Sequence, residues 1–348
     1  MFFIKIILFP ISIIYAAVTW VRNCFYAIGV YSIYTIPKPS ICIGNLTVGG
    51  TGKTPMTEYL VKMLVEKYSI AILSRGYGRK TKGIIQADSN SNATSIGDEP
   101  FQIFKKFGHQ LQVFVGEKRK LVVDYILNKF PDINLILLDD AYQHRAVSAT
   151  INLLLCDYHR PFYSDWVLPT GLLRESRWGA KRAQAIVVTK CPPLLSEKDR
   201  IKIRKRIRTY AKPWSPVFFS YLNYGTPVGV NTLLPFDSSQ KVFVFSGIAN
   251  DRPLIQYLKN NVNLCGNITF RDHHQYTAGD IRSIVHEFEK IESINKVLIT
   301  TEKDHVKLQE EGLKKLFANH LLYYLPVTFA IIQQQKEFEQ FVTDSLHS

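Results

Sequence analysis

Short apolar runs that end in glycine or polar residues alternate along the chain with segments whose apolar residues recur at helical spacing. The runs of strand type are 41–43, 70–73, 112–115, 134–138, 151–156 and 185–189. Between them, segments such as 117–130 place apolar residues every three or four positions, which is typical of amphipathic helices. Strands that alternate with helices predict an α/β fold of the P-loop NTPase type, built on a doubly wound, mostly parallel sheet.

The alternating pattern loosens between Pro213 and Pro235, where prolines and glycines accumulate, and then resumes with a second series of strands and helices. In that series we expect a helix from about Asp280 to Ile291 and strands at 242–245, 267–270 and 297–300. We therefore divide the chain into three parts, namely a membrane-associating segment at 1–36, a core domain at 37–225 and a second, smaller α/β domain at 226–348.

Residues 1–36 are conspicuously apolar. The uncharged run from Ile6 to Val21 is interrupted by Pro10, and it is shorter than the ~20 residues needed to cross a bilayer core. Three alternatives remain for this segment: an anchor that lies in the cytoplasmic leaflet, a single spanning helix, and a helix buried on the protein's own core. The first is favoured by aromatic residues that suit the headgroup boundary, which are Tyr15, Trp20, Tyr26, Tyr31 and Tyr34.

Residues 40–55 combine a short apolar strand, a glycine-rich turn and the start of an amphipathic helix. We predict that the turn and the first helical residues bind the phosphates of a nucleotide; these residues are Thr47, Val48, Gly49, Gly50, Thr51, Gly52, Lys53 and Thr54. Backbone N–H groups of such a loop point at the anion, and the helix dipole adds to the attraction. The lysine reaches the outer phosphates, and the next hydroxyl can bind Mg²⁺.

One position departs from the usual phosphate-loop motif, which has glycine where this chain has Thr47. The alternative interpretation is a glycine turn that is followed by an incidental Lys-Thr pair. The strand before the loop and the helix after it favour the phosphate site.

The net charge of +14 and the pI near 9.4 indicate an anionic partner, which could be nucleic acid, an anionic membrane surface or a phosphorylated substrate. A basic helix is expected at 196–210, either as a solvated helix face or as a contact with lipid headgroups. No aromatic stacking pattern accompanies it, so we expect no nucleic-acid partner. The five cysteines are scattered and form no Cys-x-x-Cys pair, which indicates a reducing compartment without disulfides or a zinc cluster.

Candidate carboxylates lie where strands end. Asp139 follows the apolar run 134–138, beside the expected phosphate loop, and fits the role of holding Mg²⁺ directly or through water. Its neighbour Asp140 should point elsewhere, and the alternative for both is a polar strand end. Asp98 is predicted to be the N-cap of a helix, with Pro100 just inside it. Arg174 and Glu175 follow a proline-glycine turn, with a surface ion pair as the alternative.

His273 and His274 are adjacent, and on an extended segment their side chains would face opposite ways. A metal site built from both is therefore not expected. One of them could share a proton with a carboxylate that acts as base toward an attacking hydroxyl. A purely structural histidine is the alternative.

Taken together, these motifs resemble the tetraacyldisaccharide 4′-kinases, the ATP-dependent lipid A kinases of Gram-negative bacteria. The matching stretches follow in family order at 44–55, 74–79, 97–100, 139–145, 168–175, 272–274 and 301–304. They span nearly the whole chain, and the family also has threonine at the position of Thr47. One departure is Ala141-Tyr142, where the family usually has Gly-Phe.

The resemblance implies transfer of the ATP γ-phosphate to the 4′-hydroxyl of tetraacyldisaccharide 1-phosphate, a lipid A precursor, at the cytoplasmic face of the inner membrane. It also implies that Asp98 acts with a histidine as base, and we favour His273 over His274. Lys53 is expected to take part in catalysis. A base that faces a phosphate loop on another domain suggests a cleft that closes on the substrate.

Further site residues follow from the same resemblance. The expected Mg²⁺ ligands are Thr54, Asp139, Asp140 and Glu175. The expected substrate contacts are Arg75, Gln143, His144 and Arg174. We expect ATP and Mg²⁺ as cofactors and a monomeric enzyme that associates with the cytoplasmic leaflet through its N-terminal segment.

A different class of function is a P-loop NTPase module that spends ATP or GTP on driving a protein partner. Nucleotide hydrolysis stimulated by a protein, with no phosphorylated lipid formed, would select it. The apolar N-terminal segment and the motifs around Asp98 and His273 count against this alternative.

Overall fold

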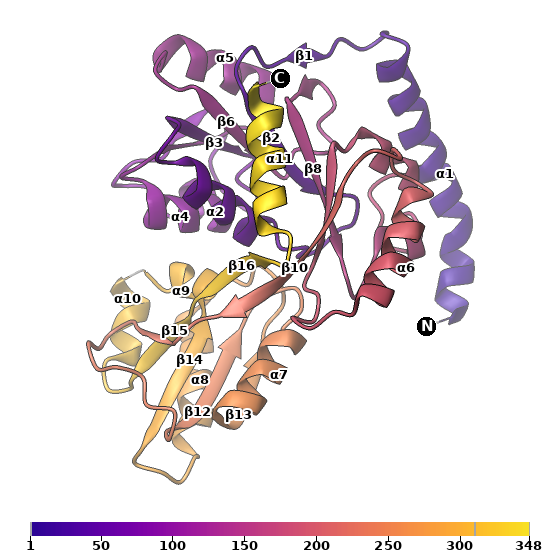
Figure 1. Ribbon diagram of the computed structural model, residues 1–348. Helices are drawn as coiled ribbons and strands as arrows, with labels where there is room; N and C mark the ends of the chain where they lie inside the picture. The colour runs from indigo at the N-terminus through magenta and orange to yellow at the C-terminus, as the bar shows by residue number, and fades with distance from the viewer. Residues whose placement is uncertain (1, 310, 348) are drawn as a thin grey trace.

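The computed structural model describes residues 2–309 and 311–347, which form two lobes and a long helix that lies against the larger lobe (Figure 1). The larger lobe is built on a nine-stranded sheet whose neighbouring strands are parallel except at its two edges. In spatial order its strands are β16 (Val327–Ile331), β10 (Val217–Tyr224), β9 (Ala185–Thr189), β8 (Ile151–Asp157), β2 (Ser40–Asn45), β6 (Leu135–Asp139), β3 (Ile70–Ser74), β5 (Gln112–Val115) and β4 (Ile85–Gln86).

The direction of winding reverses at β2. From β2 the chain builds toward β3 and β5, returns to insert β6, and then continues on the other side through β8, β9 and β10. This order confirms the predicted doubly wound α/β fold. Ligands of such sheets bind outside the carboxyl ends of the strands where the order reverses, which is where the glycine-rich loop follows β2.

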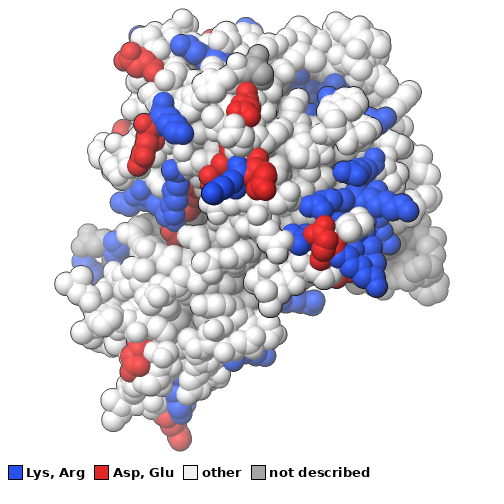
Figure 2. Space-filling view, viewed as in Figure 1, with Lys and Arg blue, Asp and Glu red and all other residues white. Residues whose placement is uncertain are grey.

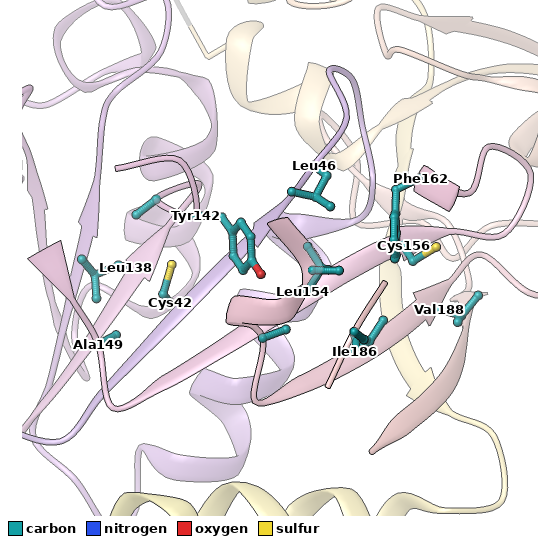
Figure 3. Close-up of a cluster of buried hydrophobic side chains, with 14 of the residues drawn as sticks. Cys42, Leu46, Leu138, Tyr142, Ala149, Leu154, Cys156, Phe162, Ile186 and Val188 are labelled. Carbon is teal, nitrogen blue, oxygen red and sulfur yellow. The ribbon is translucent and has the colours of Figure 1, made fainter. Parts of the chain in front are cut away.

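Helices cover both faces of the larger sheet. They are α2 (Lys53–Leu64), α3 (Ala93–Ile96), α4 (Asp98–Phe107), α5 (Arg119–Lys129), α6 (Glu197–Arg208) and α11 (Gln335–His347), with 3-10 turns η1 (Phe162–Ser164) and η2 (Arg177–Arg182). The apolar sides of α2, α4 and α11 pack into the core on one face, and those of α5 and α6 pack into the core on the other. Figure 3 shows part of the second core, in which Cys42 and Cys156 are small buried apolar residues.

The smaller lobe has a five-stranded sheet with helices around it. Its strands, in spatial order, are β11 (Val228–Gly229), β15 (Leu322–Leu325), β14 (Lys296–Thr301), β12 (Lys241–Ser246) and β13 (Asn263–Thr269). Its helices are α7 (Arg252–Asn261), α8 (Ala278–Glu289), α9 (Glu302–Lys307) and α10 (Glu311–Lys314), with the 3-10 turn η3 (Lys315–Phe317). A separate pair, β1 (Tyr34–Thr35) and β7 (Val147–Ser148), completes the strands of the described chain.

The strand pairing changes the expected second domain, 226–348, because the last part of this range belongs to the larger lobe. After β15 the chain returns to the larger lobe, where β16 pairs antiparallel with β10 and α11 packs onto the core. Only Pro326 separates β15 from β16, so the sequence gives no loop that would mark this return. The two lobes are therefore joined by two neighbouring crossings, one after β10 and one before β16.

Most of the N-terminal segment forms one helix, α1 (Phe2–Ala27), which contains Pro10. A proline removes one helical hydrogen bond, and the helix continues through it here. Polar residues fasten α1 to the larger lobe: Ser12 donates to Thr170 at 2.7 Å, and the Tyr15 hydroxyl donates to the Arg174 carbonyl at 3.1 Å.

Candidate active site

The glycine-rich loop has the backbone geometry of an anion cradle. Gly49 and Gly52 have φ values of 108° and 87°, a region that only glycine adopts without strain, and Lys53 begins α2 as predicted. No side chain caps the start of α2, so the N–H groups of its first turn stay available for a ligand. Thr47 forms an isolated bridge with Leu173, and this extended pairing suits a β-branched residue where the usual motif has glycine.

Side chains from neighbouring strands hold the loop in place. Asn45 donates to the Thr51 hydroxyl at 2.8 Å, and the Thr189 hydroxyl donates to the Thr51 carbonyl at 2.8 Å. Lys190, at the end of β9, donates to the Gly50 carbonyl and forms a 2.8 Å ion pair with Asp157. The cradle is thus preformed within the larger lobe. The contribution of Lys190 was not predicted, because it lies more than a hundred residues beyond the loop.

Lys53 and Arg174 share one carboxylate. Lys53 Nζ lies 3.7 Å from Asp140 Oδ2, and Arg174 Nη1 lies 3.0 Å from Asp140 Oδ1. Burial alone would raise the pKa of Asp140, but the two cations outweigh burial and hold this pKa below its usual value. Arg174 and Glu175 therefore do not form the surface ion pair that was the alternative for them.

Asp139 is in the opposite electrostatic situation. It is only 1% exposed, its Oδ1 has no hydrogen-bond partner, and the Ser74 hydroxyl reaches Oδ2 at a long 3.4 Å. Burial, the carboxylate of Glu99 and the carboxylate of Asp140 raise the pKa of Asp139 to about 7. A buried carboxylate oxygen without a donor, beside a second carboxylate, is an environment that suits a cation.

Glu175, an expected metal ligand, instead forms an internal ion pair. Arg182 donates to both of its carboxylate oxygens, at 2.7 and 2.9 Å, and Asn23 of α1 donates to one of them at 3.1 Å. The Glu175 side chain is fully buried. We correct the expectation accordingly, since its oxygens are already satisfied and it links α1 to the larger lobe.

The remaining expected substrate contacts lie close to these groups. Gln143 donates to the Asn45 carbonyl at 2.7 Å, while its own amide oxygen accepts from Arg174 at 3.3 Å. His144 is half-buried, and burial together with Arg119 and Arg75 lowers the pKa of its imidazole. The Arg75 side chain is exposed.

Asp98 does not have the predicted role of helix cap. Gly97 is the N-cap of α4, and Asp98 is the first helical residue, without a capping hydrogen bond to the backbone. A side chain at Gly97 would collide with the Tyr77 carbonyl, which lies 2.9 Å from the position of the missing Cβ, so this turn needs glycine. The Asp98 side chain is instead directed across to the smaller lobe.

The Asp98 side chain contacts His273 of the smaller lobe. Asp98 Oδ2 lies 3.2 Å from His273 Nδ1, and Gln275 donates to Asp98 Oδ1 at 3.3 Å. Burial would raise the pKa of Asp98, but the hydrogen bond from His273 and the charge of Lys307 keep this pKa below its usual value. An ionised carboxylate and an imidazole, 175 positions apart in sequence, are thus in contact between the lobes.

His274 faces its own lobe. Its Nε2 lies 3.1 Å from Asp280 Oδ2, and its ring stacks on Phe270. The two histidines do diverge as predicted, but the segment is not extended, because His273 has a left-handed φ of 57° in a turn. Only His273 contacts Asp98 among the two.

The charged residues around the Asp98–His273 pair include Lys303, whose position was not predicted. Lys303 of α9 lies 3.4 Å from both Glu99 and Asp272, and its Nζ is also 3.4 Å from His273 Nε2. Burial would lower the pKa of Lys303, but Glu99 and Asp272 keep it above its usual value. The Thr-Glu-Lys-Asp motif at 301–304 was the only sequence signal for these residues.

The cradle and the Asp98–His273 surroundings border one cleft between the lobes. Its lining includes Lys53 and Thr54 from the larger lobe, and Asp272 and Lys303 from the smaller one. Glu99, the neighbour of Asp98, lines the same cleft. A phosphate donor in the cradle and a hydroxyl near His273 would therefore meet in a shared, partly enclosed space.

Comparison with known proteins gives a consistent result. A family model described as tetraacyldisaccharide-1-P 4′-kinase matches residues 4–347. The tetraacyldisaccharide 4′-kinase of Flavobacterium johnsoniae is 40% identical over 347 residues and covers 98% of both chains. That of Cytophaga hutchinsonii is 39% identical over 338 residues, which is 97% of this chain and 94% of the other. The crystal structure of LpxK from Aquifex aeolicus in complex with ATP superposes with a TM-score of 0.75 at 25% identity over 99% of both chains.

Proposed function

This chain belongs to the tetraacyldisaccharide-1-P 4′-kinase family, and from that premise we propose that its Asp98–His273 pair is the base of the reaction. The protein is an ATP-dependent kinase of lipid A synthesis that phosphorylates the tetraacyldisaccharide. The observation that carries the proposal is the 3.2 Å contact between Asp98 and His273 beside the cleft that Lys53 lines.

The hydrogen positions follow from the partners of His273. Lys303 has only donors, so His273 Nε2 at 3.4 Å from it is an acceptor, and Nδ1 carries the hydrogen that is donated to Asp98. The acceptor hydroxyl replaces Lys303 at Nε2. As the new O–P bond forms, the hydroxyl proton moves to Nε2, the bond from the γ-phosphorus to the bridging oxygen breaks, and ADP leaves.

The cradle acts on the other partner of the reaction. The N–H groups of the loop and of the α2 N-terminus hold the β- and γ-phosphates, and Lys53 offsets the charge that grows on the leaving oxygen. Asp140 is held by Arg174 and lies 3.7 Å from Lys53 Nζ, so it positions that lysine at the lining of the cleft. Phosphoryl transfer needs such positioning more than covalent help from the protein.

Asp139 and Thr54 are the residues that would hold Mg²⁺. The fit is supported by the unpartnered Oδ1 of Asp139 and by the position of Thr54 in the first turn of α2. Mg²⁺ is usually bound by one or two carboxylates together with substrate phosphates. When bound, it neutralises phosphate charge. Within residues 2–309 and 311–347 there is no cluster of three or more acidic, histidine or cysteine ligands.

The environment of α1 supports a location on the membrane. The polar residues Ser12 and Thr19 are buried against the protein, whereas Ile7, Ile14 and Val18 are 63–72% exposed. A surface helix of a water-soluble protein instead turns its apolar residues to the core and its polar residues to the solvent. α1 is long and apolar enough to cross a membrane by length and composition alone. Because its polar side is bound to the larger lobe, we propose that it lies in the leaflet with its apolar side in the lipid.

The basic helix α6 lies on the side of the molecule that α1 occupies. The ring centroids of Phe9 on α1 and Trp166 lie 5.7 Å apart. The Arg177 guanidinium lies over the rings of Trp166 and of Tyr210, which follows α6. Figure 2 shows lysine and arginine side chains gathered over α6. Basic residues beside an apolar anchor add attraction to anionic lipid headgroups. We place this surface on the cytoplasmic face of the inner membrane, where ATP is present.

The direct test is a product assay with labelled ATP, Mg²⁺, detergent-solubilised protein and the disaccharide acceptor. We expect label on the 4′-position, and a loss of kcat of about 10²–10⁴-fold in both Asp98→Asn and His273→Ala, because each removes general-base assistance. His274→Ala is the matched control and should retain most activity, since His274 contacts Asp280 instead. ATP hydrolysis without labelled lipid, or near-normal turnover by Asp98→Asn, would overturn the proposal.

A further inference from the structure

Lys307 is a buried cation to which the mechanism above assigns no role. Its side chain is 1% exposed, and its Nζ lies 3.0 Å from Asp304 Oδ1 and 3.7 Å from Asp98 Oδ2. Lysine is almost never fully buried unless it is paired. Here it lies between a carboxylate of its own lobe and the carboxylate of the proposed base on the other lobe.

Asp304 fixes the position of Lys307. It is fully buried and accepts hydrogen bonds from the Gly247 N–H at 2.8 Å and the Thr301 hydroxyl at 2.7 Å. Its own N–H donates to the Thr301 hydroxyl at 3.0 Å, which caps α9. The lysine is therefore tied to the ends of β12 and β14 and cannot follow Asp98 if the lobes separate.

The groups of the smaller lobe that face Asp98 come from two elements. The loop after β13 supplies His273 and Gln275, and α9 supplies Lys307 in contact and Lys303 nearby. The acidic groups in this region are Glu99 on α4, Asp272 in the loop, and Asp304 on α9 beyond Lys307. Two lysines and a histidine thus stabilise one buried carboxylate, while Asp304 balances the charge of Lys307.

We propose that Lys307 is a positioning residue that keeps Asp98 ionised, so that the proton of the attacking hydroxyl goes to His273 Nε2 and not to the carboxylate. This inference rests on the proposed function of Asp98 and His273 as base. The single proton moves from the hydroxyl oxygen to Nε2, and the Nδ1 hydrogen stays between the imidazolium and Asp98. The carboxylate of Asp304 offsets the positive charge of Lys307. The imidazolium that forms at His273 is therefore repelled less by that lysine.

The test is the dependence of kcat on pH in the full-length enzyme with Lys307→Met and Lys307→Arg. An opposite charge within about 4–6 Å lowers a carboxyl pKa by about 1–3 units, so its removal raises the pKa of the pair. The direction of the pKa change is the same whether Asp98 or His273 takes up the proton, because removal of a nearby cation favours the protonated form of both. We therefore expect the acid limb of kcat in Lys307→Met to move to higher pH by about one unit, with little change in KM for ATP.

Lys307→Arg keeps the charge and should return the acid limb close to that of the wild type. A purely structural lysine would give a lower yield or a lower melting temperature, but the same pH limb in the molecules that fold. Lys336→Met, at an exposed position on α11, is the control for loss of one lysine and should leave the limb unchanged.

The outcomes separate this inference from the proposed function. If Asp98→Asn and His273→Ala lose turnover while the acid limb of Lys307→Met coincides with that of the wild type, the role of Lys307 is overturned and the base pair stands. If Asp98→Asn and His273→Ala keep turnover, the proposed base itself is wrong.

Discussion

The two halves of the active site are assembled in different ways. The phosphate cradle lies in one stretch, residues 47–54, and two residues that hold it in place, Thr189 and Lys190, lie at the end of β9 and directly after it. The proposed base is divided between lobes, with Asp98 on α4 and His273 in the loop after β13. The geometry of the cradle therefore depends on one lobe, whereas the base exists only while the two lobes keep their relative position.

Ion pairs between α4 and α9 connect the two lobes. Lys106 of α4 lies 2.7 Å from Glu302 of α9 and 2.6 Å from Glu58 of α2, and Lys303 of α9 lies 3.4 Å from Glu99 of α4. An ion pair requires its nitrogen and oxygen atoms to lie within about 4 Å of each other, so a small shift between the lobes breaks these contacts. The comparison predicts that changes in the cradle abolish chemistry directly, and that changes between the lobes act through alignment.

The largest expected effect is on the cradle side. Lys53→Met should lower kcat by at least about 10²–10³-fold, because it removes a preorganised charge at the place where negative charge develops. The fold should persist, since Arg174 still pairs with Asp140. Steady-state kinetics and a thermal melt measure the two effects. Lys62→Met, at an exposed position on the same helix, is the matched control, and equal losses in both variants would contradict the account.

A smaller effect is expected between the lobes. Lys106→Met leaves the buried Glu58 carboxylate without its cation, which should lower the free energy of unfolding by about 1–3 kcal/mol. Turnover should fall less than in Lys53→Met, with ATP binding nearly unchanged, because only the lobe alignment loosens. Denaturant unfolding and ATP titration measure these quantities. Unchanged stability together with unchanged kcat would remove the assigned role of these ion pairs.

The stability loss in Lys106→Met should depend on pH. Burial and the neighbouring Glu302 already raise the pKa of Glu58 above its unfolded value, and the loss of Lys106 raises it further. A carboxyl with a raised folded pKa destabilises the folded state as pH rises above the unfolded value. The difference from the wild type should therefore be larger at pH 8 than at pH 5. The opposite trend would show that Lys106 does not stabilise ionised Glu58.

The smallest effect on chemistry is expected from α1. Replacement of the exposed Ile14 and Val18 by glutamate should release the enzyme from vesicles that contain anionic lipid, while kcat in detergent stays close to normal. Ile294→Glu, on the exposed surface of the smaller lobe, is the control for added negative charge. Undiminished vesicle binding would leave α6 as the main contact. Deletion of 1–36 is less informative, because it also removes the Asn23 contact to Glu175.

The sequence was most informative where chemistry lies in one contiguous stretch. The strand, the glycine turn and Lys53 follow one another, so their spacing alone predicts the cradle and the sheet around it. Asp139 was singled out for the same reason, because it ends a buried strand and open α/β sheets bind ligands outside the carboxyl ends of their strands.

The spacing of neighbouring residues does not predict roles that depend on tertiary contacts. The local sequence around Asp98 indicates only a helix start, and its pairing with His273 was expected from the family resemblance alone, because the contact forms between residues of different lobes. Glu175 was expected to bind metal, but Arg182 had no motif to reveal that it occupies both oxygens. Lys307 was not singled out, since burial of a lysine cannot be read from its neighbours in sequence.

The most direct measurement of the central claim is a double-mutant cycle of Asp98→Asn and His273→Ala, in kcat with saturating ATP and acceptor. Residues that act as one unit are strongly non-additive. If the base is assembled between the lobes, the double variant should be about as slow as the slower single variant. If the two losses instead multiply, Asp98 and His273 act independently, and a base shared across the cleft is ruled out.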